Sequence, residues 1–318
     1  MSLACAIRVI CALLALASLP RFACADDKPH WVAHGEGITP AKVGPAAVGY
    51  TKLKPFAGGQ INQKKDYPFG TWIDRATSYD GFDVPAGHLL IEGVAFTSSL
   101  DISAPFPVVL RGVSVRLSQA SPWAILMRPT SGGLYVLWSE AGGGEDMTAF
   151  PKPIDVALDL RGAPAAVYHS RFSRALDSLH ISGSKTRVEQ NLIDDLLAFP
   201  ESHNDGIQLL GRPRDVTIHK NRITSRHPQT SCINLLGTRL KVSSNYLAGG
   251  GWTLYGGANN NGHGGEAGGP VTVSDNIFGR DVFAKSGHFG PVAYWDKSDN
   301  SRGLWENNRF SDGAAVMP

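Results

Sequence analysis

The 318-residue chain is 42% hydrophobic and contains 36 glycines and 20 prolines. This composition excludes an intrinsically disordered chain and favours a turn-rich fold with few long helices. The 30 basic residues, less Arg8 and Arg21 of the N-terminal segment, leave 28 against 28 acidic residues. A neutral chain lacks the basic field that binding to nucleic acid or to an anionic membrane needs, so neither is an expected partner.

Residues 1–25 have the three parts of a secretory signal peptide. Arg8 provides the positive start, residues 9–17 are apolar, and Ala23-Cys24-Ala25 is a small-x-small cleavage site. The apolar run is shorter than the ~20 residues that span a bilayer, so we expect no stable membrane anchor. A lipoprotein anchored through Cys24 is the weaker alternative, since Arg21 stands where an aliphatic residue is expected. The protein is therefore predicted to be secreted or periplasmic.

Cysteine use follows from this processing. Cys5, Cys11 and Cys24 lie in the signal peptide, so Cys232 alone remains and no intrachain disulfide is expected. Cys232 begins an apolar stretch, which favours a buried structural thiol over a nucleophile. An exported chain without disulfides needs a large regular core. Residues 26–83 lack the pattern that follows and are predicted to form an extended or capping segment over the first coil.

An apolar-polar-polar-Asn-x-apolar pattern recurs along residues 84–318. Its asparagines are 30, 24, 31 and 32 residues apart, at Asn191, Asn221, Asn245, Asn276 and Asn308. Ser170 occupies the same place in an earlier copy. Asparagine suits such turns because its side chain bonds nearby backbone and tolerates left-handed conformations. Stacked asparagines also pair with each other in ladders.

A second motif lies between these copies. Residues 206–211 (Gly-Ile-Gln-Leu-Leu-Gly) match residues 232–237 (Cys-Ile-Asn-Leu-Leu-Gly), and residues 252–256 and 292–296 take the same place later. Each repeat consists of short alternating strands separated by turns. The pattern predicts a solenoid of stacked parallel strands rather than a propeller or a β-sandwich. We expect a monomer.

The sequence resembles the right-handed parallel β-helix proteins of the pectate-lyase-like superfamily, in particular exported bacterial members. The matching stretches are residues 84–87 (Val-Pro-Ala-Gly), 203–208 (His-Asn-Asp-Gly-Ile-Gln), 249–257, 289–292 and 305–310. The resemblance implies an all-β, right-handed parallel β-helix over residues 84–318. It also implies a polysaccharide partner, although members of the superfamily differ in chemistry.

Alignment of the second motif by its glycines predicts which side chains point outward. It places Ile207, Ile233 and Trp252 in an inward row. The expected outward, substrate-binding side chains are Gln208, Asn234, Thr253 and Trp295, with Tyr255 beside them. Aromatic faces next to hydrogen-bonding groups suit extended sugar chains, because a pyranose has an apolar face and a polar rim. The alternative is a solvated polar ladder with no ligand.

Reactive candidates lie in the loops that lead into this strip. His203 and Asp205 belong to a stretch similar to the Asn-Thr-Asp-Gly-Ile region of polygalacturonases, in which the Asp is catalytic. The Asp pair of the next coil is missing, because Ser231-Cys232 stands there. A hydrolase needs two carboxyl groups ~5 to 9.5 Å apart, and Asp194, Asp195, Glu201 and Asp205 offer candidates within one coil. Asp205 is equally suited to capping its own turn.

A lyase needs a cation for the uronate carboxylate, a base and an acid. The predicted catalytic groups are His203, Asp205, Arg226, His227 and Tyr255, and calcium is a candidate cofactor at Asp194 and Asp195. We therefore predict an enzyme that cleaves an acidic polysaccharide, with elimination favoured over hydrolysis. The alternative is a non-catalytic surface or matrix protein that binds glycan through the same strip.

Overall fold

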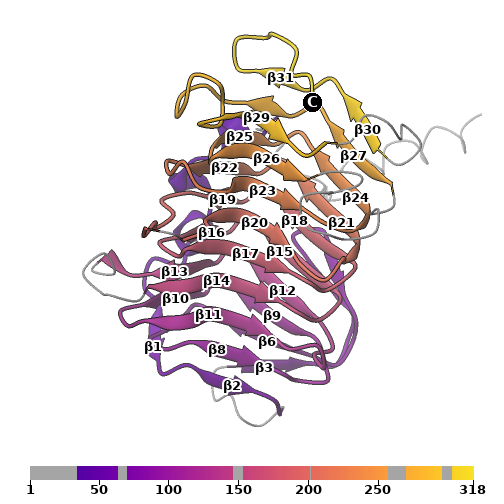
Figure 1. Ribbon diagram of the computed structural model, residues 1–318. Helices are drawn as coiled ribbons and strands as arrows, with labels where there is room; N and C mark the ends of the chain where they lie inside the picture. Colours follow the sequence, from indigo (N-terminus) through magenta and orange to yellow (C-terminus); the bar gives the residue numbers. More distant parts are fainter. Residues whose placement is uncertain (1–33, 64–69, 146–152, 201, 257–269, 296–302) are drawn as a thin grey trace, which may run out of the picture.

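A computed structural model describes residues 34–63, 70–145, 153–200, 202–256, 270–295 and 303–318. Three sheets run the length of the molecule, and the chain visits them in a repeating order (Figure 1). Consecutive coils stack in parallel register, ~4.8 Å apart. The predicted fold, a right-handed parallel β-helix, is confirmed.

Sheet A consists of β1 (Lys54–Phe56), β7 (Val94–Phe96), β10 (Ser114–Leu117), β13 (Glu140–Gly143), β16 (Arg171–Ser173), β19 (Leu192–Ile193), β22 (Arg222–Ser225), β25 (Tyr246–Gly249), β28 (Ile277–Phe278) and β31 (Arg309–Phe310). Sheet B consists of β2 (Gly59–Ile61), β8 (Leu100–Ile102), β11 (Ser121–Met127), β14 (Ile154–Leu160), β17 (Asp177–Ile181), β20 (Asp205–Leu209), β23 (Ser231–Leu235), β26 (Trp252–Gly256) and β29 (Gly290–Ala293). Sheet C consists of β3 (Gly70–Ile73), β6 (His88–Glu92), β9 (Val108–Arg111), β12 (Leu134–Leu137), β15 (Ala165–Tyr168), β18 (Thr186–Glu189), β21 (Arg214–His219), β24 (Thr238–Ser243), β27 (Val271–Ser274) and β30 (Gly303–Glu306).

The core is built from columns of apolar side chains that repeat at the same place in each coil. Sheet C shows this most simply, because its column passes from one branched side chain to the next in strict register. The members of this column are Leu110, Val136, Val167, Val188, Ile218 and Val242, all at most 1% exposed. Each coil therefore buries its inward residues only against its neighbours, as expected of a solenoid.

The predicted asparagine column is confirmed. Nδ2 of each asparagine donates to Oδ1 of the next one, from Asn191 through Asn221, Asn245 and Asn276 to Asn308, over distances of 2.9 to 3.0 Å. Each Oδ1 also accepts the backbone N–H of the preceding asparagine. These side chains are nearly or fully buried, so the ladder satisfies polar groups that would otherwise be costly.

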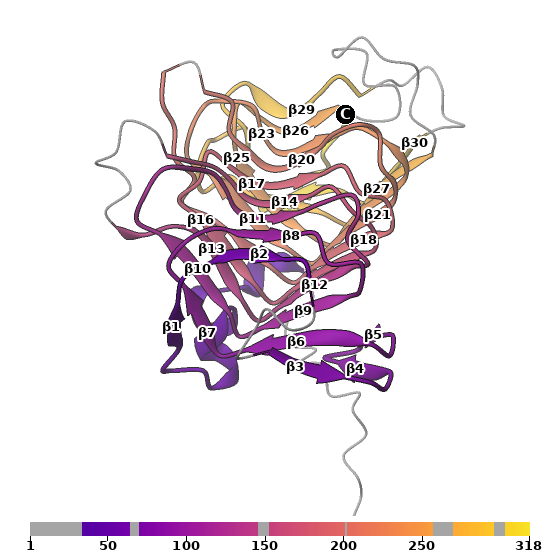
Figure 2. The same cartoon turned by 90° about the horizontal axis from the view of Figure 1, so that it is seen from below.

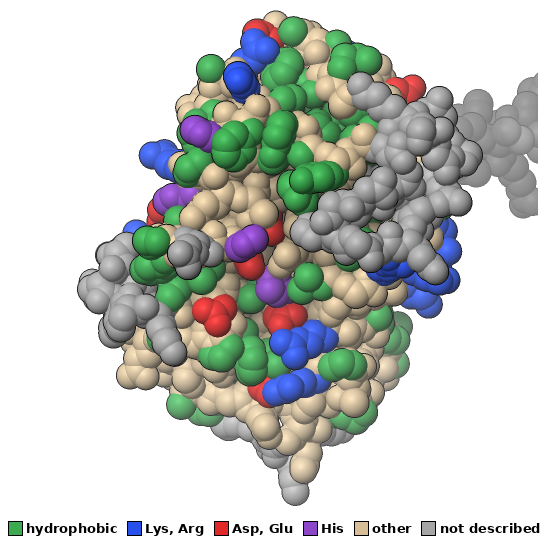
Figure 3. Space-filling view, in the orientation of Figure 1, with side chains coloured by type: hydrophobic (Ala, Val, Ile, Leu, Met, Phe, Trp, Pro, Cys, Tyr) green, Lys and Arg blue, Asp and Glu red, His purple; other side chains and the backbone are tan. Residues whose placement is uncertain are grey.

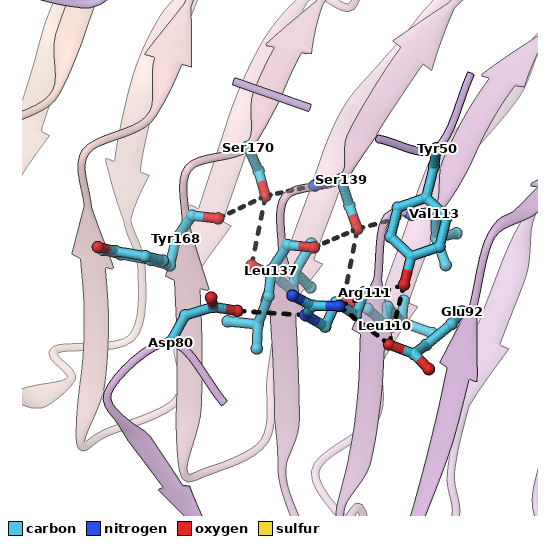
Figure 4. A network of polar contacts seen from close by, with 11 residues as sticks. Tyr50, Asp80, Glu92, Leu110, Arg111, Val113, Leu137, Ser139, Tyr168 and Ser170 are labelled. Atoms are coloured by element: carbon cyan, nitrogen blue, oxygen red, sulfur yellow. Dashed lines mark hydrogen bonds and ion pairs between the residues drawn. The ribbon is translucent and has the colours of Figure 1, made fainter. Parts of the chain in front are cut away.

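Serines continue the ladder toward the N-terminus. Asn191 Oδ1 accepts the N–H of Ser170, and the hydroxyl of Ser170 accepts the N–H of Ser139 (Figure 4). The predicted place of Ser170 is thus confirmed. The left-handed residue of each turn is the one before the ladder position, such as Gln190 and Lys220, rather than the asparagine itself.

Residues 35–50 form a strap that lies along the side of the β-helix instead of capping its end. The strap contains three 3-10 helices, η1 (Gly35–Gly37), η2 (Pro40–Lys42) and η3 (Pro45–Val48). Its backbone N–H groups donate to Ser244 O from Gly35 (2.9 Å) and to His169 O from Gly44 (2.8 Å). In Figure 2 the strap is the indigo segment beside sheet A.

The lower end of the strap is held by a network of charged and phenolic groups (Figure 4). The Tyr50 hydroxyl donates to Glu92 (3.0 Å) and accepts from Arg111 (3.2 Å), while Arg111 also pairs with Asp80 (3.3 Å). Asp80 belongs to the turn between β4 (Thr77–Tyr79) and β5 (Phe82–Val84). The network therefore joins the strap, this hairpin and two coils of sheet C.

The N-terminal boundary predicted for the β-helix differs from the structure. β1 and β2 pair in parallel with the next coil, so the stack begins at Lys54 and not at residue 84. β3 runs antiparallel to β6 and ends sheet C, where Trp72 packs edge-on against Phe106. Among the described residues, β3 covers the edge of β6, and the capping role of residues 26–83 as a segment stays a prediction. The predicted signal peptide, residues 1–25, lies outside them.

Cys232 is fully buried, as predicted, and burial raises the pKa of its thiol to about 12. This environment suits a structural side chain rather than a nucleophile. Among the described residues, none forms a helix of the length and hydropathy that crossing a bilayer requires.

Candidate functional site

The outward face of sheet B, which is turned toward the viewer in Figure 1, carries two rows of side chains. Each strand here places two consecutive side chains in the core, as β14 does with Ala157 and Leu158. The outward side chains on either side of this pair therefore stand three residues apart. The first row is Trp123, Val156, Asp177, Asp205, Ser231 and Trp252. The second row is Leu126, Asp159, His180, Gln208, Asn234 and Tyr255.

A chain of polar contacts lies at the middle of these rows. Nε2 of His180 is 2.8 Å from Oδ2 of Asp177, and both side chains reach the surface, at 18% and 14% exposure. Oδ1 of Asp177 accepts the backbone N–H of Asp205 (2.6 Å). The hydroxyl of Ser231 donates to Oδ1 of Asp205. Histidine and acidic side chains are seen gathered over β14, β17 and β20 in Figure 3.

Asp205 is the most perturbed acid of this group. Its side chain is completely buried, and its Oδ2 has no hydrogen-bond partner in the part of the chain that the structure describes. Burial, and after it the charge of Asp177, raise the pKa of Asp205 to about 7 against the opposing effect of the hydrogen bond from Ser231. Near neutral pH this carboxyl therefore exchanges a proton, which is typical of functional sites.

His180 is shifted by the same carboxylates. Burial lowers its pKa, but the hydrogen bond and charge of Asp177 and the charges of Asp159 and Asp205 outweigh burial, so the pKa is raised. No described residue bonds Nδ1 of His180. With Nε2 held by Asp177, the other ring nitrogen is available to exchange a proton with a bound molecule.

Two arginines stand on the same face, one and two coils below His180. Arg161 pairs with Asp159 (2.7 Å) and Arg128 with Asp101 (2.6 Å), and both guanidinium groups remain about two-fifths exposed. Both lie over the ring of Trp123, at 5.9 and 5.7 Å from its centroid. Each planar guanidinium keeps N–H donors directed to solvent, so the pair suits a carboxylate ligand.

Four of the predicted site residues lie on this face. Asp205 is in the first row, while Gln208, Asn234 and Tyr255 follow each other in the second. His203 is exposed in the loop before β20. The face therefore brings together the main predicted acid and the predicted polar strip, and their catalytic and binding roles stay predictions.

The predicted register of β26 is wrong. Trp252 aligns with Ser231 rather than Ile233, so it stands in the outward first row. Thr253 is consequently buried, with its hydroxyl 2.9 Å from that of Ser286, and is not part of the surface. Trp295 packs against Trp305, with ring centroids 5.2 Å apart, at the edge of the core.

The remaining predicted residues lie beside sheet A, on a different side of the β-helix. Asp194, Asp195 and Arg226 line a cavity of about 890 Å³ together with residues of the strap. His227 bonds the carbonyl of Leu196 through Nε2 (2.8 Å). Arg226 thus lies at the cavity beside sheet A and His227 in the turn between β22 and β23, whereas Asp205 and Tyr255 belong to strands of sheet B.

The predicted calcium ligands already have partners. Asp194 is held by Arg171 in a two-bonded fork (3.0 and 3.1 Å), and Asp195 pairs with Arg174 (2.9 Å). Within the described ranges no three His, Cys, Asp or Glu side chains gather as metal ligands. Ca²⁺ needs several carboxylate or carbonyl oxygens that are not already bonded to a cation. Asp194 and Asp195 do not fit this ion, because Arg171 and Arg174 already neutralise their carboxylates.

Sequence reasoning missed Asp177 and His180. Residues 177–181 (Asp-Ser-Leu-His-Ile) repeat the pattern of residues 205–209 (Asp-Gly-Ile-Gln-Leu), with the same spacing between the outward positions. Extending the second motif by one coil toward the N-terminus identifies both residues. The copy also ends in Gly183, at the place of Gly211 and Gly237, so the alignment by glycines would have included it had it been extended to this coil.

No protein-family model matches the chain, and no curated protein is similar to it in sequence. Among solved structures, the crystal structure of the Dettilon tailspike protein is similar over 72% of this chain, with 11% identity and a TM-score of 0.43. The match covers 52% of the tailspike chain, so this chain spans about half the length of that protein. Membership of the pectate-lyase-like superfamily stays a prediction.

Proposed function

We propose that the protein cleaves an acidic polysaccharide by β-elimination on the outward face of sheet B. The observation that carries the proposal is the kind of group that this face exposes. An imidazole oriented by a carboxylate, His180 with Asp177, lies near the exposed guanidinium groups of Arg161 and Arg128. A base and a cation for the uronate carboxylate are what elimination requires.

His180 takes the role of the base. Asp177 holds Nε2 (2.8 Å) and stabilises the imidazolium, so Nδ1 accepts the C5 proton of the uronate. The C5–H pair forms the C4–C5 double bond as the C4–O bond breaks. The imidazolium then returns the proton to the leaving oxygen, so His180 ends as it began and no other reactant is consumed.

Arg161 and Arg128 take the role of the electrostatic clamp. A guanidinium bonded to the uronate carboxylate withdraws charge from it and makes the C5 proton more acidic. The ion pairs with Asp159 and Asp101 hold these guanidinium groups in place over Trp123. Because the two guanidinium groups are already oriented before the substrate binds, less conformational entropy is lost on the way to the transition state.

Hydrolysis is less well supported, because it needs two carboxyl groups that reach the sugar. Asp205 is fully buried, and Asp159 is 5% exposed and bonded to Arg161. Asp177 is then the single accessible carboxylate of the central group.

Glycan binding without cleavage is the second candidate. Trp123 and Trp252 stand at the two ends of the first row, five coils apart, and the amides of Gln208 and Asn234 lie in the second row beside them. Half-buried aromatic rings with polar groups between them suit a bound sugar chain even if no bond is broken.

The proposal is tested by incubation of the protein with a panel of uronate polymers. We expect ultraviolet absorbance of the unsaturated product to rise with the wild type and His219→Ala, and not with His180→Ala. His219 is a matched control, because it lies half-buried on the outward face of sheet C. Retention on a polymer without product supports the binding protein instead. Full activity of His180→Ala contradicts the assignment of the base.

We further propose that the protein acts outside the cytoplasm as a monomer after removal of residues 1–25. Neutral charge and a lone buried cysteine support an exported chain that needs no disulfide. Mass spectrometry of the protein isolated from its source is expected to find Asp26 at the N-terminus.

A further inference from the structure

Exposed aromatic rings gather at the C-terminal end of the sheet B face. Phe289 is 56% exposed and Tyr294 is 52% exposed. The ring of Phe289 lies 6.1 Å from that of Trp252, and Tyr294 lies 4.8 Å from Tyr255. Figure 3 shows apolar side chains concentrated over β26 and β29, beyond the histidines and acids of the central group.

These rings are arranged as two tilted pairs rather than as a flat stack. The planes meet at 40° for Trp252 and Phe289 and at 58° for Tyr255 and Tyr294. In each pair one ring is more than half exposed, Phe289 in the first and Tyr294 in the second. Contiguous exposed apolar surface of this kind marks a binding site rather than chance exposure.

The position of the rings ties them to the proposed site. Tyr255 continues the second row, three coils beyond His180, and Gln208 and Asn234 fill the coils between them. At the spacing of parallel strands, Tyr255 is therefore ~14 Å from the base along the stack. A molecule that reaches both places must be extended, and a sugar chain bound at His180 has this shape.

We propose that Trp252, Tyr255, Phe289 and Tyr294 form an aromatic platform that binds sugar residues of the polymer remote from the bond being cleaved. The inference rests on the proposed function for its ligand, an acidic polysaccharide. The apolar faces of pyranose rings lie on the aromatic faces, while the partly exposed amide of Gln208 in the second row bonds the polar rim of a neighbouring sugar. The protein thus prefers long chains and cleaves them internally.

The platform predicts a dependence on chain length. Phe289→Ala and Tyr294→Ala, singly and together, are compared with wild type on a trisaccharide and on the polymer. We expect the double variant to lower kcat/KM for the polymer about ten times more than for the trisaccharide, since an aromatic contact contributes on this scale. In the His180→Ala background, the same pair of substitutions weakens polymer retention in affinity electrophoresis by a similar factor.

Leu304→Ala and Met317→Ala are the matched controls, because these side chains are 50% and 73% exposed and do not belong to the platform. Both are expected to bind and cleave as the wild type does. Thermal melting checks that all the variants fold. Phe289→Tyr and Tyr294→Phe keep the rings and are expected to restore chain-length dependence.

The outcomes separate the platform from the reaction. Polymer cleavage that the double variant leaves unchanged overturns the platform while β-elimination stands. Polymer bound through the platform without unsaturated product supports the platform and overturns the reaction. If the aromatic surface instead joins two copies of the chain, sedimentation will show a dimer for the wild type and a monomer for the double variant. That result overturns the inference, and so does the absence of binding to every polymer of the panel.

Discussion

Asp205→Asn is expected to change how the stability of the protein depends on pH. The pKa of this buried acid is raised from 3.8 to about 7, chiefly by burial. A raised folded-state pKa stabilises the folded protein fully below the unfolded pKa, and this contribution is lost as the pH rises through the folded pKa. The shift of about three units corresponds to on the order of 4 kcal/mol, because each unit is worth about 1.4 kcal/mol.

Most of the stability that Asp205 contributes is lost within a pH range in which unfolding can be measured. Wild type should lose about 3 kcal/mol of unfolding free energy from this group between about pH 5 and about pH 8.5. An Asn side chain does not titrate, so the Asp205→Asn protein lacks this loss. Its amide N–H stands where Oδ2 has no partner, which costs about 1–3 kcal/mol at every pH. The informative quantity is therefore the change with pH, not the absolute stability.

Urea unfolding of both proteins across this pH range measures the difference through the midpoint and the m-value. Asp83→Asn is the control, because Asp83 is exposed on β5. We expect the stability of Asp205→Asn relative to wild type to rise steadily with pH. Parallel stability curves for the two proteins would refute the assignment of a buried, protonated carboxyl at this position.

Three further outcomes are expected. Because the pKa of His180 is raised above 6.5, the ascending limb of kcat/KM should lie above that pH, and Asp159→Asn should move it to lower pH in a pH–rate profile. Asn245→Ala should destabilise the fold by about 3 kcal/mol in urea unfolding, since it breaks the buried ladder on both sides, whereas Asn62→Ala should have little effect. The thiol of Cys232 should react with a disulfide reagent only after unfolding, because burial raises its pKa to about 12; rapid labelling of native protein would contradict this.

Some features of the fold follow from short-range pattern alone. Asn191, Asn221 and Asn245 occupy the same place in each copy of a six-residue motif, and stacking any such copies in parallel aligns them. The motif also separates inward from outward residues, because side chains of a strand alternate. The solenoid, the ladder and the burial of Cys232 were predictable for this reason.

The site depended on register between distant coils, which local pattern does not specify. Asp205 and Ser231 are 26 residues apart, whereas Ser231 and Trp252 are 21 apart, so loops of unequal length separate residues that pair. Glycines are poor markers across such loops. The alignment therefore placed Trp252 inward and Thr253 outward, opposite to their positions in the structure.

By itself, the sequence determined the type of coil, since the ladder and the apolar columns are periodic and each coil repeats the same local contacts. Only the tertiary structure decided which polar residues meet. Asp194 and Asp205 are 11 residues apart in sequence, yet the chain passes from sheet A to sheet B between them, so one lines the cavity beside sheet A and the other belongs to the sheet B face. Asp177 and Asp205, from different coils, touch because backbone pairing of β17 with β20 sets them side by side.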